Sequence, residues 1–133
     1  MLRKLKPKDK INFEYFAKQN NISKYLFSDF VKQKTLAFIS EEHDKIKGLI
    51  FIEKQDDSYL NVITKSKKIA NNLLKIFFWN WKKEVYAKID ESNKLGFVLK
   101  ENGFRTVNKT NKTFLLYYNP NDKRKRYGKR NNR

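Results

Sequence analysis

Residues 59–81 read YLNVITKSKKIANNLLKIFFWNW, and the spacing of the apolar residues changes within this stretch. As far as Ile63 the apolar residues form a short, strand-like run. Beyond the polar residues 64–68 the apolar positions recur every three or four residues, as on one face of a helix: Ile69, Leu73, Leu74, Ile76, Phe77 and Trp81. The stretch therefore predicts a strand over 59–63, a short loop, and a helix over 67–82.

Two further strand-like runs lie immediately upstream. Residues 48–53, GLIFIE, form the most clearly buried strand pattern in the chain, and residues 35–40 form a second β-like run. The polar residues 41–45 and 55–58 separate the runs and predict turns. Because consecutive strands joined by short turns usually pair with each other, the region predicts a three-stranded antiparallel meander.

The N-terminal segment predicts one short strand and two helices. Residues 2–6 alternate between apolar and basic and end at Pro7, which is typical of an edge strand. Asp9 and Ser23 are of the residue types that cap helices, and each precedes a run with helical spacing. The apolar residues of these two runs are Ile11, Phe13, Phe16 and Ala17, and then Tyr25, Leu26, Phe30 and Val31.

Downstream of the long helix the sequence predicts a strand over 85–89, a short helix over 95–101 and a last strand over 113–118. The order of elements is then β-α-α-β-β-β-α-β-α-β. This order predicts one mixed α/β (α+β) domain over residues 1–118, whose first half is largely antiparallel.

The chain is strongly basic. It carries 31 Lys and Arg against 14 Asp and Glu, a formal net charge of +17 at pH 7, and this excess favours polyanionic partners such as nucleic acid or a nucleoprotein. Codon usage accounts for part of the excess, because the abundant Lys, Asn, Ile and Phe all have AT-rich codons. The composition is therefore also the one expected from an AT-rich bacterial or phage genome.

Residues 119–133 lie beyond the predicted domain as a basic tail. The segment 123–133 has no apolar periodicity, so we expect it to be disordered by itself. Its basic residues are candidates for binding nucleic-acid phosphates: Lys123, Arg124, Lys125, Arg126, Lys129, Arg130 and Arg133. If the tail neutralises about five phosphates, log K for DNA should fall with log salt at a slope of about −4 to −5. The alternative is a solubilising tail without a dedicated partner.

The composition also excludes several classes of site. The absence of cysteine excludes disulfides, thiolate nucleophiles and thiolate metal sites. With His43 as the single histidine, a multi-histidine metal centre cannot form within one chain, and no metal is expected. The most apolar stretch, residues 73–81, is about half as long as a membrane span. We expect a soluble, cytoplasmic protein with no membrane partner.

The predicted order of elements resembles the fold of the GNAT N-acetyltransferases, and residues 62–74 resemble the acyl-CoA loop of that family. In the family this loop reads Val-x-Pro, then Arg/Gln-x-x-Gly-x-Gly/Ala, then a Leu-Leu pair. Here Lys65 falls at the Arg/Gln position, Lys68 falls where Gly is usual, and Ala70 is an allowed residue. The resemblance implies acetyl-CoA as cofactor, bound by Val62, Thr64, Lys65, Ser66, Lys67, Lys68, Ile69 and Ala70.

Lys68 is the main departure from the pattern of this loop. A coenzyme A diphosphate would be held mainly by N–H groups at the helix start, and glycine lets the backbone come close to it. Forcing Lys68 into a left-handed conformation would cost about 1–2 kcal/mol. Lys65, Lys67 and Lys68 would in return supply three cations. The alternative is a solvated helix start in a chain that has lost the cofactor.

A second segment also resembles the family. After the fifth strand the family often reads Asn-x-x-Ser/Ala-x-x-x-Leu/Tyr-x-Lys-x-Gly-Phe. Aligned on Gly103 and Phe104, Ser92 falls at the Asn position with Asn93 beside it, and both are implied as cofactor-binding residues. Leu99 falls where the family commonly has the tyrosine that protonates the departing thiolate, so that role is unfilled.

These features lead to two main hypotheses. The first is an acyl-CoA-dependent N-acyltransferase that acetylates an amine of a nucleic acid or of a nucleic-acid-associated protein. Its general base would be Glu53 or His43, although residues of these types in such positions are more often plain surface residues. The second is a catalytically inactive GNAT-like module that binds DNA, RNA or a nucleoprotein assembly through its basic surface and tail. A phage DNA-modification enzyme on this fold is a narrower third alternative.

Overall fold

The computed structural model describes residues 1–23, 26–32, 36–53 and 59–121, and the predicted basic tail over 123–133 and the turn predicted at 55–58 lie outside these ranges. The elements in chain order are β1 (Leu2–Lys4), the 3₁₀ turn η1 (Pro7–Asp9), α1 (Lys10–Gln19), α2 (Leu26–Lys32), β2 (Ala37–Glu42), β3 (Lys45–Ile52), β4 (Leu60–Thr64), α3 (Lys67–Asn80), β5 (Val85–Asp90), α4 (Leu95–Glu101), β6 (Arg105–Thr110) and β7 (Thr113–Tyr118).

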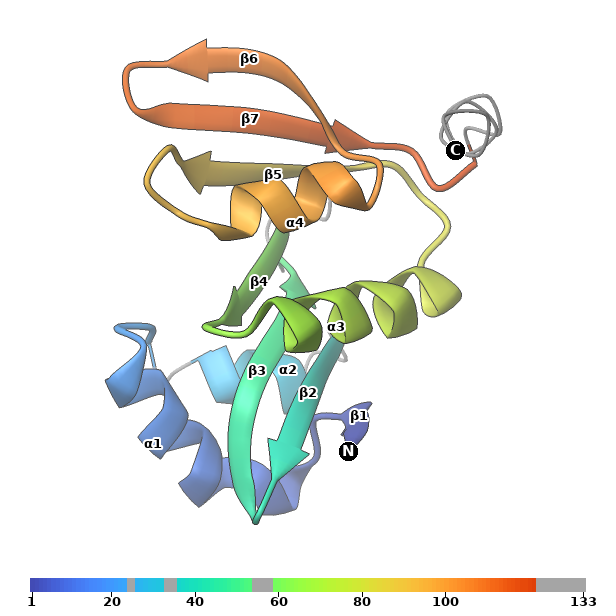
Figure 1. The fold of residues 1–133 in the computed structure, drawn as a ribbon. Helices are drawn as coiled ribbons and strands as arrows, with labels where there is room; N and C mark the ends of the chain where they lie inside the picture. The colour runs from blue at the N-terminus through green and yellow to red at the C-terminus, as the bar shows by residue number, and fades with distance from the viewer. Residues whose placement is uncertain (24–25, 33–35, 54–58, 122–133) are drawn as a thin grey trace.

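The strands form two sheets that open from each other as a V (Figure 1). The first sheet has the order β1-β2-β3-β4 and the second the order β5-β7-β6, and neighbouring strands are antiparallel throughout. The predicted meander of β2, β3 and β4 is therefore confirmed. The sheets meet at a parallel bridge between Tyr59 and Tyr86. From there β4 and β5 diverge, so that the V opens on the side where α3 and α4 begin.

The helices cover opposite faces of the first sheet. Successive residues of a strand point to opposite faces, and β3 supplies apolar residues to both. Leu49 and Phe51 join the cluster under α1 and α2, whereas Ile50 and Ile52 join the cluster under α3 and α4. The second cluster continues across the V into β5 and β7 and holds the two sheets together. No helix within the described residues is long and apolar enough to cross a membrane.

The strand β6 was not predicted. It forms the edge of the second sheet, and all six of its residues are exposed. A strand without a buried position shows no apolar alternation, which is why the sequence RTVNKT gave no strand signal. The pairing with β7 also shifts register between Thr106 and Asn108. The corrected order of elements ends β-α-β-β.

The turn between β2 and β3 is shorter than the predicted turn over 41–45. It consists of His43 and Asp44, with φ of 51° and 62°. Two positive φ values in a two-residue loop are typical of the type I′ hairpin turn, whose twist matches that of the strands. The strands therefore extend through Glu42 on one side and from Lys45 on the other.

Asp9 precedes α1 as predicted, but its side chain does not cap that helix. The carboxylate instead accepts the Lys6 N–H at 2.8 Å and pairs with the Arg3 guanidinium at 2.7 and 2.8 Å. Arg3 also reaches Glu41 at 3.2 Å. One largely buried ion pair thus ties β1 to the start of α1 and to β2.

Candidate functional site

Two polar side chains shape the loop between β4 and α3. Thr64 Oγ1 donates to the Lys47 carbonyl at 2.9 Å and accepts the Ser66 N–H at 3.2 Å. Ser66 caps α3, because its Oγ accepts the Ile69 N–H at 3.2 Å. The N–H groups of Lys67 and Lys68 belong to the first turn and have no acceptor within the helix. The loop therefore offers an anion two backbone donors and the positive end of the helix dipole.

Lys68 occupies this loop without backbone strain. It lies within the right-handed helix α3, and positive φ does not occur between residues 64 and 70. The cost expected from replacing glycine is therefore absent, because this chain does not use a left-handed residue here. Lys65, Lys67 and Lys68 are all exposed, so their ammonium groups add positive charge around the same helix start.

The backbone N–H and C=O of Val62 point into the opening between the two sheets. The Glu53 N–H donates to the Tyr59 carbonyl at 2.9 Å, which makes Glu53 and Tyr59 a hydrogen-bonded pair. Hydrogen-bonded and non-hydrogen-bonded pairs alternate along an antiparallel ladder, so Val62, opposite Ile50, belongs to a non-hydrogen-bonded pair. Its N–H and C=O therefore point away from β3 and toward the space left by β5.

Ala70 faces the protein interior, and Ile69 is half-buried at its edge. Ala70 is fully buried in the cluster under α3, and Ile69 packs against the same cluster. Gly48 of β3 lies directly beneath them, since a Cβ added there would come within 2.7 Å of Ile69 Cγ2. These two predicted cofactor residues therefore position the helix start, and their side chains contribute packing.

Ser92 and Asn93 lie in the turn between β5 and α4, across the V from the β4–α3 loop. The N–H and hydroxyl of Ser92 both donate to Asp90 Oδ1, at 2.9 and 2.7 Å, and they lower the pKa of that carboxyl. Asn93 Oδ1 accepts the Leu95 N–H at 2.9 Å. Both predicted residues are exposed and hold the turn in shape.

Two contacts join α3 to α4 beside the opening of the V. Asn102 donates to Asn71 Oδ1 at 2.7 Å, and the exposed ammonium of Lys67 lies 3.6 Å from Glu101. Leu99, at the position where the family commonly has a tyrosine, is 1% exposed and packs in the core. This position of α4 therefore supplies no hydroxyl in place of the family's tyrosine.

The two predicted bases lie at opposite ends of β3. His43 is in the β2–β3 turn, whereas Glu53 follows the other end of the strand, where its carboxylate accepts a hydrogen bond from Asn61 at 3.0 Å. Eight residues of strand separate them, roughly 25 Å. They cannot serve one site together, and Glu53 is the one beside the Tyr59–Tyr86 bridge between β4 and β5.

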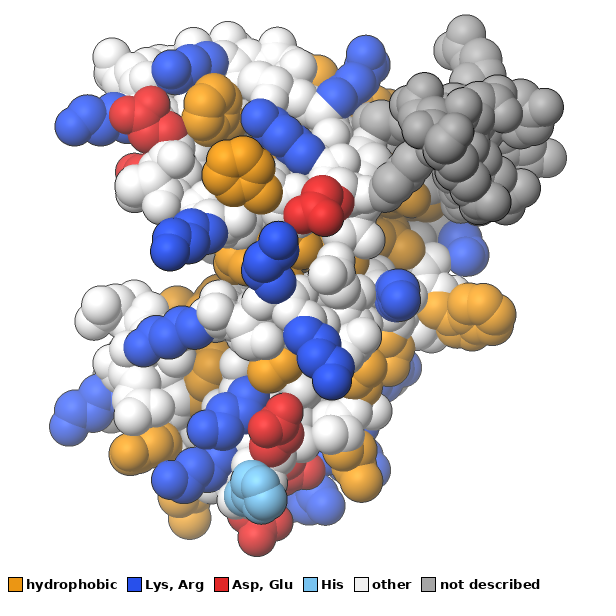
Figure 2. All heavy atoms as spheres, viewed as in Figure 1, with side chains coloured by type: hydrophobic (Ala, Val, Ile, Leu, Met, Phe, Trp, Pro, Cys, Tyr) orange, Lys and Arg blue, Asp and Glu red, His pale blue; other side chains and the backbone are white. Residues whose placement is uncertain are grey.

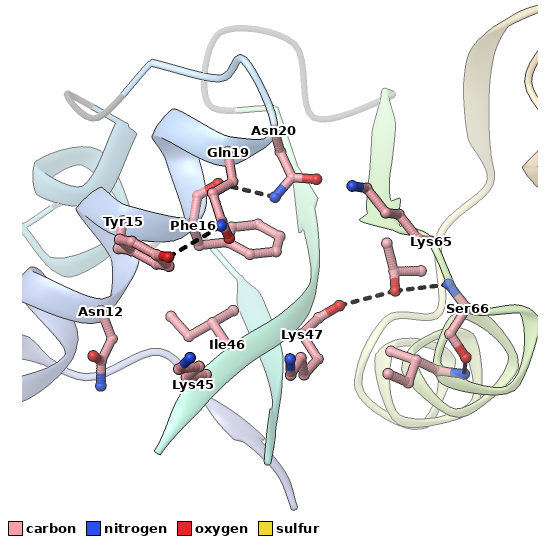
Figure 3. Close-up of a pocket in the computed structure, with 12 residues that line it drawn as sticks. Asn12, Tyr15, Phe16, Gln19, Asn20, Lys45, Ile46, Lys47, Lys65 and Ser66 are labelled. Carbon is pink, nitrogen blue, oxygen red and sulfur yellow. Dashed lines mark hydrogen bonds between the residues drawn. The ribbon is translucent and has the colours of Figure 1, made fainter. Parts of the chain in front are cut away.

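A groove of about 520 Å³ lies between α1 and the ends of β3 and β4 (Figure 3). Its described lining from the β4–α3 side is Thr64, Lys65, Ser66 and Ile69. The remaining lining residues are Asn12, Tyr15, Phe16, Gln19, Asn20, Lys45, Ile46 and Lys47. Sequence reasoning missed these eight residues, because they come from two segments without a recognisable motif and meet only in the folded chain.

Lysine and arginine side chains are spread over the face on which α3 and α4 lie (Figure 2). The figure also shows an indentation between the two halves of the molecule, with basic side chains on both sides of it. The seven basic residues predicted in the tail lie outside the described residues. The positive charge therefore extends over the domain itself and is not confined to the tail.

Comparisons of sequence find no relative, since no model of a known protein family matches the chain and no curated protein matches it. Comparisons of structure find solved proteins with a similar fold. A GNAT-family acetyltransferase from Streptococcus pneumoniae is 11% identical with a TM-score of 0.70, and the match covers 90% of this chain and 98% of that one. The ribosomal-protein-S18-alanine N-acetyltransferase from Escherichia coli is 12% identical with a TM-score of 0.68, covering 90% and 92%.

A third similar structure is the PaiA N-acetyltransferase from Thermoplasma acidophilum in complex with coenzyme A. It is 16% identical with a TM-score of 0.61, and the match covers 90% of this chain and 98% of that one. At such low identity these likenesses establish the fold, and the predicted GNAT fold is confirmed. The predicted roles of individual residues are not tested by them.

Proposed function

We propose that the protein is an acyl-CoA-dependent N-acyltransferase that transfers an acetyl group to an amine. The observation that carries the proposal is the start of α3, where a Ser66 cap, two N–H groups and three lysines lie beside the open edge of β4. Such a helix start suits a diphosphate. The extended backbone at Val62 suits the amide-bearing arm of the same cofactor.

The residues of this loop fit the cofactor chemically. Lys67 and Lys68 would hold the diphosphate through their N–H and ammonium groups, and Lys65 would add a third cation. Ser92 and Asn93, in the turn between β5 and α4, would border the cofactor from the other side of the V. Coenzyme A supplies an acyl group activated as a thioester, so the chain itself needs to bind, orient and deprotonate.

Orientation is the main contribution we assign to the protein in the acyl transfer. Holding an amine against a bound acyl donor replaces a bimolecular encounter, and this alone can supply much of the rate. Leu99 gives no proton donor, so the departing thiolate would take its proton from water. Glu53 donates its N–H to the Tyr59 carbonyl beside the β4–β5 junction, and it is the proposed general base in preference to His43.

The acceptor is proposed to be an amine of a nucleic acid or of a protein bound to one. The net charge of +17 supports this choice, because a basic surface concentrates polyanions and the molecules that travel with them. Acetyl-CoA and nucleic acid would then both be attracted to the chain, each through its phosphates.

The test is calorimetric titration with acetyl-CoA at moderate and high salt, with desulfo-CoA and ATP as comparison ligands. Replacing both Lys67 and Lys68 with Gln should raise the Kd for acetyl-CoA about thirtyfold, since two charged hydrogen bonds worth about 1 kcal/mol each are lost. The matched control replaces Lys75, farther along α3, and Lys82, just beyond its end, with Gln and should leave the Kd unchanged.

Selective binding that survives high salt supports the proposal. Binding that ATP shares and that salt abolishes would mean that the lysines attract phosphates in general. In that case the second candidate function, a GNAT-like module that binds nucleic acid without catalysis, takes its place. The buried Leu99 favours this second candidate, because it leaves the position of the family's acid without a hydroxyl.

A further inference from the structure

We propose that the groove between α1 and β3 binds one nucleotide of a single-stranded nucleic acid, with its phosphate against the lysines and its base against α1. The inference rests on the proposed function only in its choice of acceptor, and it assigns that acceptor a place on the molecule. The groove lies outside the V, on the α1 side of the β4–α3 loop.

Three lysines line the groove from different parts of the chain. Lys45 and Lys47 come from β3, and Lys65 extends from the β4–α3 loop toward Asn20 (Figure 3). None of the described lining residues is acidic, and none of these three ammonium groups pairs with a described carboxylate. Lys65 is shared with the proposed cofactor loop, so Lys45 and Lys47 are the two cations that favour a phosphate in the groove itself.

A β-bulge presents Lys47 to the groove. In the β2–β3 ladder Ser40 pairs with Gly48 and Glu41 with Ile46, so Lys47 is the extra residue on its strand. A bulge redirects the side chain it carries. The Lys47 carbonyl is also fixed, because it accepts the Thr64 hydroxyl that shapes the loop before α3. The groove and the loop are therefore parts of one hydrogen-bonded framework.

The α1 side of the groove carries groups suited to a base. Tyr15 is 55% exposed, and its hydroxyl accepts the Gln19 amide at 3.2 Å, which holds the ring in place. The Asn12 side chain has no hydrogen-bond partner among the described residues. The side-chain oxygen of Asn20 is also available, because its amide bonds only through Nδ2, to the Phe16 carbonyl. Side-chain amides pair with base edges, and aromatic rings stack on base faces.

The size of the groove fits a nucleotide better than a duplex. Its volume of about 520 Å³ is within the range of sites that hold small molecules, roughly 300–1,000 Å³. A base inside a duplex is stacked and paired and cannot reach a ring on α1, whereas a base in a single strand can be turned outward. The ligand is therefore a single strand.

The test is binding of a fluorescein-labelled 12-nucleotide single-stranded oligonucleotide, as DNA and as RNA, measured by anisotropy over a range of salt. Replacing Lys45 and Lys47 with Gln removes two phosphate contacts, so the slope of log K against log salt should become less steep by about 1.4. If the affinities at 1 M salt are equal, the variant should bind about 25-fold more weakly than the wild type at 0.1 M salt. The control pair Lys75→Gln and Lys82→Gln should change binding less than about threefold, and the slope should stay the same.

The base contact is tested with an abasic strand of the same length. Tyr15→Ala should weaken binding of the normal strand about fivefold and leave the abasic strand unaffected. Ile11→Ala, an exposed residue of the same helix outside the groove, should affect neither strand. Equal losses for both strands would overturn the base contact.

We call the Lys45 and Lys47 variant the groove pair and the Lys75 and Lys82 variant the control pair. Equal oligonucleotide affinities and salt slopes for the two variants would overturn the proposal, and so would absence of oligonucleotide binding to the wild type. Measuring the acetyl-CoA affinity of the same variants distinguishes a failure of this proposal from a failure of the proposed function. The groove pair should leave acetyl-CoA affinity unchanged, and a loss of acetyl-CoA binding without a loss of oligonucleotide binding would reassign the groove to the cofactor. Groove-dependent strand binding in a protein that ignores acetyl-CoA would uphold this inference and reject the acyltransferase.

Discussion

Gly48 sets how closely α3 approaches the first sheet. An added Cβ would lie 3.0 Å from Leu73 Cδ1 and 3.2 Å from Thr64 Cβ, in addition to its contact with Ile69. Gly48→Ala should therefore push the first turn of α3 outward, destabilise the fold by about 1–3 kcal/mol and weaken acetyl-CoA binding. Urea denaturation and calorimetry measure the two effects.

Gly96 provides the matched control for this substitution. A Cβ there would meet Ile89 at 3.5 Å, an ordinary contact, and the residue lies inside α4. Gly96→Ala should leave stability unchanged or raise it by up to about 1 kcal/mol, because alanine favours the helix. Equal effects of the two substitutions would contradict the role assigned to Gly48.

Single residues also show the limit of reading a site from its motif. The sequence places Lys65, Ser66 and Lys68 at the β4–α3 loop, and the structure has them there. The cost of a left-handed Lys68 does not arise, because α3 begins at Lys67 and Lys68 lies in its right-handed first turn. A motif identifies the position of a residue, but the packing around it decides its conformation.

Among the elements, β1 is anchored by charge. Burial would raise the pKa of Asp9, but the hydrogen bonds from Arg3 and from the Lys6 N–H outweigh it and hold the pKa below its ordinary value. Because the folded-state pKa is lowered, the stabilisation is complete above the unfolded pKa of about 3.9 and is lost as pH falls through the folded value. Asp9→Asn should cost about 2–4 kcal/mol at pH 7.

The loss should begin to shrink below about pH 4, where Asp9 of the unfolded wild-type chain becomes protonated, and it should disappear once pH has fallen through the lower pKa of the folded protein. Urea unfolding of both proteins between pH 2 and pH 7 measures this convergence. Asp44→Asn is the control, since this exposed turn residue has positive φ, which asparagine accepts, and its curve should follow the wild type. A gap that is as wide at pH 2 as at pH 7 would rule out the ion pair as the cause.

Elements with one buried face were predictable and an element without one was not. The helix α4 was predicted with its observed bounds, because Leu95, Val98 and Leu99 mark its buried face. The edge strand β6 was missed, since every position in it meets solvent. The groove beside α1 was missed for a related reason, because its lysines and amides look like ordinary surface residues until the chain folds.

At the scale of the whole molecule the charge of the domain and that of the tail make separable contributions. Replacing the seven basic residues between 123 and 133 with Gln should reduce the salt slope for duplex DNA by about 4 to 5, if about five phosphates are contacted. The Lys45 and Lys47 variant should change the slope for a single strand and have little effect on duplex binding. Anisotropy titrations over a range of salt, with both DNA forms, measure this difference. An unchanged duplex slope after tail neutralisation would leave the tail without a role in binding.

The strand order β5-β7-β6 also has a consequence for synthesis of the chain. The central strand of this sheet, β7, is the last to leave the ribosome, so β5 and β6 each lack their partner until Tyr118 has emerged. At about 5–20 residues per second, the interval between Asp90 and Tyr118 lasts a few seconds. For that time β5 exposes an unpaired edge, and Ala87 lacks its cross-strand neighbour Leu116. The nascent chain is then most open to wrong pairing, and a ribosome stalled before Tyr118 would leave it so.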